Sequence, residues 1–386
     1  MTLFSDFSFF ALLSVLLVPA VVLGYREKDR RYYILFVSVV FDALAIGRDP
    51  LHIVFFLGYI FLETALVKVY GKVRERRGRE GKIYAVFLIL SILPLILSKI
   101  SGFLPVRLFQ IIGISYLTFK SAQIVIEIYD GVIKEISIFD TLNFLLFFPC
   151  IVSGPIDRSR RFGEDLNRKI PKDEYLEMVG EGLWKLCLGL MYKAVISSYF
   201  YEGMELLTES YSSFAGVGYA YAYGLYMFFD FAGYSLMAIG AGLFLGIRTP
   251  DNFNRPFLSR DIKEFWDRWH ITLSHWFRDF LFTRLVMQSM RHKWFKNRLR
   301  TACAGFIADM FVMGIWHGLT PYYLMYGLYH GVLLALNEVW QKKSKFYKKH
   351  KKEKWYQVIS WAVTMQLVMF GFLIFSGNFP FAGPQQ

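Results

Sequence analysis

The sequence predicts an all-α, polytopic membrane protein with about ten to eleven membrane helices. Three observations favour this fold class. Of the 386 residues, 55% are hydrophobic and 19% aromatic, which is too apolar for an ordinary soluble protein. The apolar residues occur in runs, several of them near the roughly twenty residues that a helix needs to cross a bilayer. The net charge is +13, and the lysines and arginines gather in short segments between the runs, as in cytoplasmic loops.

Residues 1–386 are expected to form a single integral membrane domain, because no repeat or low-complexity linker interrupts them. The positive charge is attributed to membrane topology and not to nucleic-acid binding, since no nucleic-acid-binding module is visible. The three cysteines, Cys150, Cys187 and Cys303, form no CxxC pair, so neither a disulfide framework nor a zinc site is supported.

The first half of the chain contains four apolar runs that are interpreted as spans, at 7–24, 32–46, 53–70 and 83–97. Two of these spans separate the basic loops at 26–31 and 71–82, which places both loops in the cytoplasm and the N-terminus outside. The run at 108–128 carries Lys120 and Gln123 and is expected to be buried among other helices. The run at 139–152 has only fourteen residues, so a re-entrant helix that helps to shape a cavity is expected.

The second half continues the alternation of spans and loops. The segment at 175–200 becomes apolar along its length, and 201–213, with three glutamates and no basic residue, is expected to be an outside loop. The run at 215–247 is rich in small residues that allow close helix packing, and it carries one acid, Asp230. Further spans are expected at 301–317, 321–340 and 355–375, with the basic segment 342–354 in the cytoplasm and the C-terminus outside.

One stretch differs from the rest in being charged, aromatic and rich in histidine. It reads SRDIKEFWDRWHITLSHWFRDF, residues 259–280, and Asp261 with Glu264 predicts a capping box at the start of a helix. On a helical projection, His270 shares an apolar face with three tryptophans, whereas His275 lies on the polar face. The stretch is therefore expected to form an in-plane amphipathic helix at the membrane interface or beside a wet cavity. A second motif, MGIWHGL, places His317 at the end of an apolar helix.

FWDRWHITLSHWFRDF, followed by GIWHG, resembles the membrane-bound O-acyltransferase family. Three further motifs, FDFAGYS, FNRPFLSRDIKEFW and YGLYHG, match that family too, and the resemblance covers nearly the whole chain. The resemblance implies membrane helices around a central tunnel. Within the family, SGPIDRSRRF and Leu236 resemble the branch that transfers D-alanine to teichoic acid more than the branch that acetylates alginate.

Acyl transfer to a hydroxyl requires a base, and histidine suits this role near neutral pH. Considered alone, a histidine that follows Trp316 is more often a packed core residue. The family resemblance implies instead that His317 is the catalytic base and that His270 is the second catalytic histidine, which orients or polarises the acyl group. The alternative for His270 is a structural histidine packed among tryptophans.

Four more residues are candidates for lining the substrate tunnel: Trp266, Trp269, Asp230 and His330. For Asp230 the alternative is a structural hydrogen bond between helices, although acids inside membranes are often functional. No metal site is expected, because His270 and His275 are five residues apart and no HExxH motif occurs. No GxSxG motif occurs either, which favours direct transfer over a serine acyl-enzyme.

The resemblance also implies the donor, a D-alanyl thioester on the 4'-phosphopantetheine arm of an acidic carrier protein, with no cofactor bound by the chain itself. Basic and apolar residues that suit such a partner lie at Arg284, Val286, Met287, Met290 and Arg291. The alternative explanation of this strip is cytoplasmic topology with contact to anionic lipid. The implied acceptor is teichoic acid outside the cell, and other membrane proteins of the same pathway are further candidate partners.

Three other functions remain open from the sequence. An alginate-type O-acetyltransferase would keep the family and change the acyl group. A transporter would move the donor without catalysis, although the lack of an inverted repeat weakens this alternative. A scaffold for other envelope enzymes would need His317 only for stability.

Overall fold

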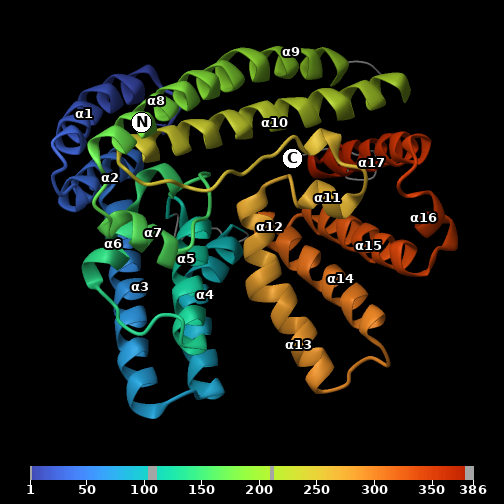
Figure 1. Cartoon of the computed structure of the whole chain (residues 1–386), viewed down its shortest axis with the longest axis horizontal. Coiled ribbons are helices and arrows are strands. Elements are labelled where there is room, and N and C mark those ends of the chain that lie inside the picture. Colours follow the sequence, from blue (N-terminus) through green and yellow to red (C-terminus); the bar gives the residue numbers. More distant parts are fainter. Residues whose placement is uncertain (1, 103–110, 209–212, 379–386) are drawn as a thin grey trace. The chain divides into compact units, whose positions relative to one another are not determined.

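The computed structural model describes residues 2–102, 111–208 and 213–378, and regular structure in these residues is helical (Figure 1). The chain groups into two compact units, Met1–Leu190 with Gly233–Pro250, and Met191–Ala232 with Asp251–Gln386. No linker-like sequence marks the borders of these units, and the single domain expected from the sequence stays a prediction.

In its described residues, the first unit contains eight helices and the end of a ninth. They are α1 (Phe7–Tyr25), α2 (Arg31–Ile46), α3 (Pro50–Arg77), α4 (Gly81–Ser101), α5 (Ile114–Asp130), α6 (Ile138–Leu146), α7 (Ser159–Asn167) and α8 (Lys172–Met191), with the last part of α10 (Ser213–Phe244). A 3-10 turn, Phe148–Cys150, follows α6. As Figure 1 shows, α3 and α4 form a hairpin, and α4 packs along α5.

The second unit contains the helices that carry the candidate site. A π-helical turn, Tyr192–Ile196, leads into α9 (Ser197–Thr208) and the first part of α10. The remaining helices are α11 (Ile262–Trp266), α12 (Ile271–Phe277), α13 (Thr283–Arg291), α14 (Arg298–His317), α15 (Pro321–Lys343), α16 (Lys345–His350) and α17 (Lys354–Phe375). A 3-10 turn, Pro256–Leu258, precedes α11, and a π-helical turn, Arg278–Phe282, joins α12 to α13.

Six helices in the described ranges are long and apolar enough to cross a membrane: α1, α3, α4, α10, α14 and α17. The helices α2 and α5, with 16 and 17 residues, correspond to two of the other expected spans. The total of ten or eleven membrane helices therefore stays a prediction.

Two predictions about the first unit are confirmed. The run at 108–128 corresponds largely to α5, and its first residues, 108–110, lie outside the described part of the chain. Lys120 on α5 is only 1% exposed. The Lys120 ammonium donates hydrogen bonds to the carbonyls of Phe144 and Leu145, at 2.9 and 3.2 Å. These carbonyls end α6, which at nine residues and about 1.5 Å per residue is too short to cross a bilayer. A buried lysine thus donates hydrogen bonds to C-terminal carbonyls of the short helix that the sequence predicted.

Two other predictions are wrong. The outside loop expected at 201–213 is helical as far as Thr208, because its glutamate, leucine and methionine residues are good helix formers; residues 209–212 lie outside the described part.

The amphipathic stretch at 259–280 is not one helix. It starts as expected, with the Asp261 carboxylate accepting hydrogen bonds from the amides of Lys263 and Glu264, both at 2.9 Å. However, α11 ends at Trp266, and a new helix begins after His270.

Candidate active site

The α14–α15 hairpin fixes the position of His317. These helices pack at backbone contact, because a Cβ on Gly314 would lie 2.5 Å from the Tyr323 carbonyl oxygen. A Cβ on Gly327 would lie equally close to the carbonyl oxygen of Met310. His317 is the last residue of α14, and the helix ends at Gly318. The close packing holds His317 at the start of α15.

Aromatic rings surround the His317 imidazole while leaving it half-buried. Its centroid lies 4.6 Å from that of Trp316, 5.9 Å from that of Tyr323 and 5.0 Å from that of Phe375, the last residue of α17. The ring therefore sits where α14, α15 and α17 meet. A base in this position is both accessible to a reactant and shielded from bulk water.

His270 is held by a backbone clamp between segments on either side of α11. The Ile271 amide donates to the Asn252 carbonyl at 2.9 Å, and the Asn254 amide donates to the Arg268 carbonyl at 3.0 Å. An isolated antiparallel bridge joins Phe253 to Trp269 within the same clamp. These bonds occupy the Ile271 amide and the Arg268 carbonyl, which a continuous helix would use for its own hydrogen bonds, and this explains the break in the amphipathic stretch.

The backbone of His270 is strained by this arrangement. Its φ of +43° lies in the left-handed region, which costs a residue with a side chain about 1–2 kcal/mol. Strain of this kind often accompanies functional sites, because the surrounding structure must hold the residue in place. The Thr272 hydroxyl, 2.5 Å from the Asn252 side-chain oxygen, braces the same turn.

The His270 imidazole is buried and available for chemistry. Its side chain packs against Phe231, with ring centroids 4.6 Å apart, and the residue is only 5% exposed. Its Nδ1 atom has no hydrogen-bond partner among the described residues. Burial lowers the pKa of His270 well below its usual value, and the nearby His317 lowers it further. Both influences favour the neutral form of the His270 imidazole, and the two histidines lie close enough to interact electrostatically.

His330 forms a third, fully buried position beside them. The Trp266 indole N–H donates to Nδ1 of His330 at 3.3 Å, so Nδ1 is an acceptor and the imidazole proton is assigned to Nε2. The Tyr326 ring contacts His330 at 4.6 Å and His317 at 6.3 Å between centroids. Tyr326 was not predicted from the sequence, although it lies one helical turn before His330 in the YGLYHG motif.

Trp266→Phe should lower the free energy of unfolding by about 1–3 kcal/mol, because it leaves the buried Nδ1 of His330 without its donor. The measurement is denaturant unfolding in a mild detergent. Trp294→Phe, at an exposed position, serves as the control. The double variant Trp266→Phe/His330→Phe should lose less than the sum of the two single losses. Strictly additive losses would contradict the coupling between the two rings.

Asp230 on α10 forms an ion pair with Lys193 of the π-helical turn. The pair links two segments of the second unit, which agrees with the structural alternative for Asp230. The next residue, Phe231, is the one that packs on His270. The ion pair therefore anchors the part of α10 that contacts His270, and a direct role of Asp230 toward substrate stays a prediction.

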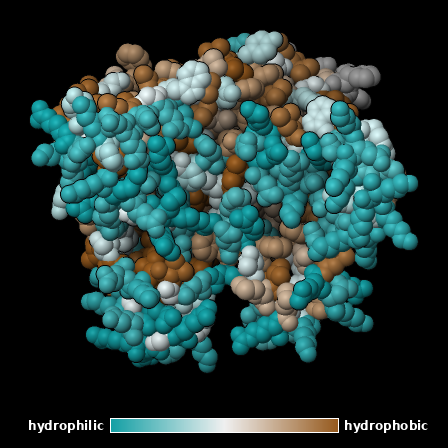
Figure 2. All heavy atoms as spheres, viewed as in Figure 1, coloured by the Kyte–Doolittle hydropathy of each residue, from teal (hydrophilic) through white to brown (hydrophobic). Residues whose placement is uncertain are grey.

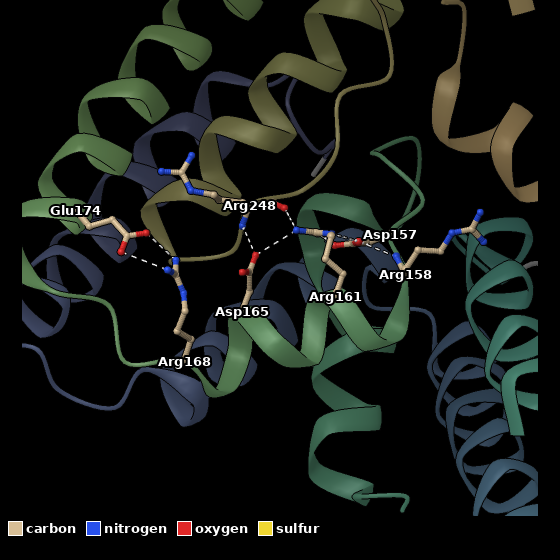
Figure 3. A network of polar contacts seen from close by, with 7 residues as sticks. All are labelled: Asp157, Arg158, Arg161, Asp165, Arg168, Glu174 and Arg248. Atoms are coloured by element: carbon tan, nitrogen blue, oxygen red, sulfur yellow. Dashed lines mark hydrogen bonds and ion pairs between the residues drawn. The ribbon is translucent and has the colours of Figure 1, made fainter. Parts of the chain in front are cut away.

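In the first unit, the motif SGPIDRSRRF forms a polar network around Arg161 (Figure 3). The Arg161 guanidinium pairs with Asp157 and with Asp165, and it also donates to the carbonyl of Arg248. Asp165 in turn accepts a hydrogen bond from the Arg248 amide at 2.8 Å. Burial raises the pKa of the Asp157 carboxyl, and Arg161 opposes that rise. These bonds hold the backbone at Arg248, in the segment that follows α10. That segment leads directly to Asn252, where the backbone clamp described above begins.

Comparison with known proteins identifies the family to which this chain belongs. A sequence model of the membrane-bound O-acyltransferase family matches residues 80–377. The chain belongs to the membrane-bound O-acyltransferase family. As a member, it is an acyltransferase and a multi-pass membrane protein, consistent with the six long apolar helices found among the described residues.

Two relatives of this O-acyltransferase cover nearly its whole length. It is 40% identical to a teichoic acid D-alanyltransferase of Bacillus subtilis, over 98% of each chain. It is 39% identical to a protein of the same name from Streptococcus thermophilus, over 96% of this chain and 93% of that one. A protein named probable alginate O-acetylase from Pseudomonas syringae is 33% identical over 70% of this chain and 50% of its own.

The second unit of this O-acyltransferase thus brings together the predicted residues His317, His270, His330 and Trp266. Trp269 lies beside them, stacked on Phe265 with ring centroids 5.5 Å apart. Both tryptophans are buried, so they support the histidines, and their contact with substrate stays a prediction. Asn252 and Phe231 were not predicted as site residues. Only the motifs that contain or adjoin them, FNRPFLSRDIKEFW and FDFAGYS, could have pointed to them.

The basic and apolar strip predicted for docking lies on α13 and differs in one residue from the expectation. Met287 and Met290 are 58% and 45% exposed, as a docking surface requires. Val286, however, faces α14, where its side chain would lie 3.0 Å from a Cβ on Gly305. Two exposed residues that follow α13, Trp294 and Phe295, extend the apolar surface instead.

Proposed function

We propose that this protein transfers D-alanine from a carrier-protein thioester to a hydroxyl of teichoic acid on the outer side of the membrane. The observation that carries the proposal is the 40% identity to a teichoic acid D-alanyltransferase over 98% of both chains. The pairing of a half-buried histidine with a buried neutral one supplies the groups that the chemistry requires.

In this mechanism His317 accepts the proton of the acceptor hydroxyl while the hydroxyl oxygen attacks the thioester carbonyl. The neutral His270 donates a hydrogen bond to the carbonyl oxygen, where negative charge develops. The C–S bond then breaks, the new C–O ester bond remains, and His317 returns its proton to the departing thiolate. The surrounding aromatic rings exclude water, which would otherwise hydrolyse the thioester.

The donor would be the 4'-phosphopantetheine arm of an acidic carrier protein in the cytoplasm, and the protein itself would bind no cofactor. The arm would enter a central tunnel through the family fold of ten or eleven membrane helices and reach the histidines from the cytoplasmic side. Both chain termini would then lie outside. Other membrane proteins of the same pathway would receive or guide the teichoic acid acceptor.

The test uses purified protein in liposomes, with D-alanyl-loaded and acetyl-loaded carriers offered in parallel. We expect labelled D-alanine to become ester-linked to a teichoic-acid acceptor while acetyl does not. Transfer of acetyl alone would favour the alginate-type alternative, which shares 33% identity over 70% of this chain. Movement of unreacted donor across the membrane, with no ester formed, would favour a transporter.

The docking surface makes a separate prediction. Met287→Glu/Met290→Glu should weaken carrier binding by about tenfold or more, because buried apolar anchors dominate such interfaces and an acidic carrier would also be repelled. Affinity would be measured with the loaded carrier and detergent-solubilised enzyme. Gln288→Glu adds a negative charge on an exposed position of α13 without removing an anchor and should have a smaller effect. Equal binding by the double variant and wild type would place the carrier elsewhere.

A further inference from the structure

A cavity of about 600 Å³ lies within the second unit, on the side of α15 and α17 that α16 closes at one end. It is separate from the three histidines, none of which lines it. Its walls differ sharply in character. One end is lined by lysine, arginine and tyrosine side chains, and the other by leucine, isoleucine and valine.

The apolar end is formed by side chains that the protein leaves uncovered. Leu336 of α15 is 59% exposed, and Ile359 and Val363 of α17 are 55% and 53% exposed. Because α17 is one of the helices long and apolar enough to cross a membrane, its exposed side chains Ile359 and Val363 would face the hydrocarbon of the bilayer. The apolar wall is therefore continuous with the space that lipid chains occupy.

The cationic end has more positive charge than its own carboxylates neutralise. The Asp261 carboxylate caps α11 and accepts from the Gln341 side chain at 3.0 Å, and Glu264 is paired with Arg268. In the described part of the chain, no carboxylate pairs with Arg260, Lys351 or Lys352. Figure 2 shows hydrophilic residues gathered over α16 at the edge of this region.

Topology decides which side of the membrane this end faces. The segment 342–354 carries many lysines, and short segments of this kind remain in the cytoplasm. Anionic lipids of the cytoplasmic leaflet attract such lysines. A ligand with a negative headgroup and an apolar tail satisfies both ends of the cavity at once.

We propose that this cavity binds one anionic glycerophospholipid of the cytoplasmic leaflet. Its phosphate lies against Arg260, Lys351 and Lys352, and one acyl chain follows the apolar wall between α15 and α17. The Arg260 carbonyl accepts a hydrogen bond from Ser360 of α17 at 2.5 Å, which holds the Arg260 backbone beside α17 at this end of the cavity. Lipid binding at this site is independent of the acyl-transfer function proposed above.

The test is native mass spectrometry of delipidated protein titrated with dioleoylphosphatidylglycerol or dioleoylphosphatidylcholine. Wild type should retain one phosphatidylglycerol with higher affinity than phosphatidylcholine. Lys351→Ser/Lys352→Ser should weaken that binding about thirtyfold, since each lysine near an anionic headgroup contributes on the order of a fivefold effect. Val363→Trp, which fills the apolar end, should also reduce retention of the lipid.

Two matched controls separate this site from general effects. Lys348→Ser/Lys349→Ser removes two positive charges, as the test variant does, but at positions of α16 that do not line the cavity. Val358→Trp adds an indole at an exposed position of α17 that lies outside the cavity. Both controls should bind as wild type does. Equal losses in the two lysine double variants, equal affinity for both lipids, or unchanged binding by Val363→Trp would each overturn the proposal. Thermal unfolding confirms that every variant compared is folded.

Discussion

His317→Ala should lower the rate of D-alanyl transfer by about 10²–10⁴-fold, the usual contribution of a general base. His317 ends α14 and remains half-buried among the rings of Trp316, Tyr323 and Phe375. It is the most accessible of the three histidines in the site, since His270 and His330 are 5% and 0% exposed. In the proposed mechanism, a hydroxyl that enters the site would therefore meet His317 as its proton acceptor.

Single-turnover transfer from the D-alanyl carrier measures this effect without interference from product release. The rate should fall while carrier affinity and the unfolding midpoint stay near those of wild type. His292→Ala, at an exposed position after α13, is the control and should transfer normally. A folded His317→Ala protein that transfers D-alanine at the wild-type rate would show that His317 is structural.

Local signals in the sequence predicted several elements correctly. Asp261 caps α11 because its short acidic side chain suits a helix N-terminus. The run at 139–152 forms only a short helix because Pro149 lies within the run and cannot donate a helical hydrogen bond. The expectation that Lys120 is buried was also correct, although its partners, the carbonyls that end α6, could not be predicted because they lie more than twenty residues away.

Two differences from the expectation, the break before His270 and the orientation of Val286, have a common physical cause. The break before His270 depends on backbone bonds to Asn252 and Asn254, which override the helical periodicity that continues through the break. The orientation of Val286 depends on Gly305, whose lack of a side chain lets α13 approach α14. Helical periodicity describes one segment at a time, so it cannot include contacts supplied by another segment.

Substitution of His270 should separate its chemical role from its backbone role. His270→Asn should keep the protein folded, because asparagine tolerates the left-handed conformation better than most residues. It should nevertheless lower transfer by about 10²–10³-fold, the usual effect of losing a donor to a developing oxyanion. His270→Val should instead lower the free energy of unfolding by about 1–3 kcal/mol, because a β-branched residue at a φ of +43° is strained.

Transfer and denaturant unfolding measured on both variants distinguish the two roles. If His270 polarises the thioester carbonyl, the asparagine variant is folded and slow, and its carrier affinity is unchanged. If His270 only shapes the turn, the asparagine variant transfers at nearly the wild-type rate and the valine variant alone is impaired. Asn252→Ala provides a further comparison: it removes the side-chain contact to Thr272 but keeps the backbone bond to Ile271. It should slow transfer less than His270→Asn, because the imidazole itself remains in place.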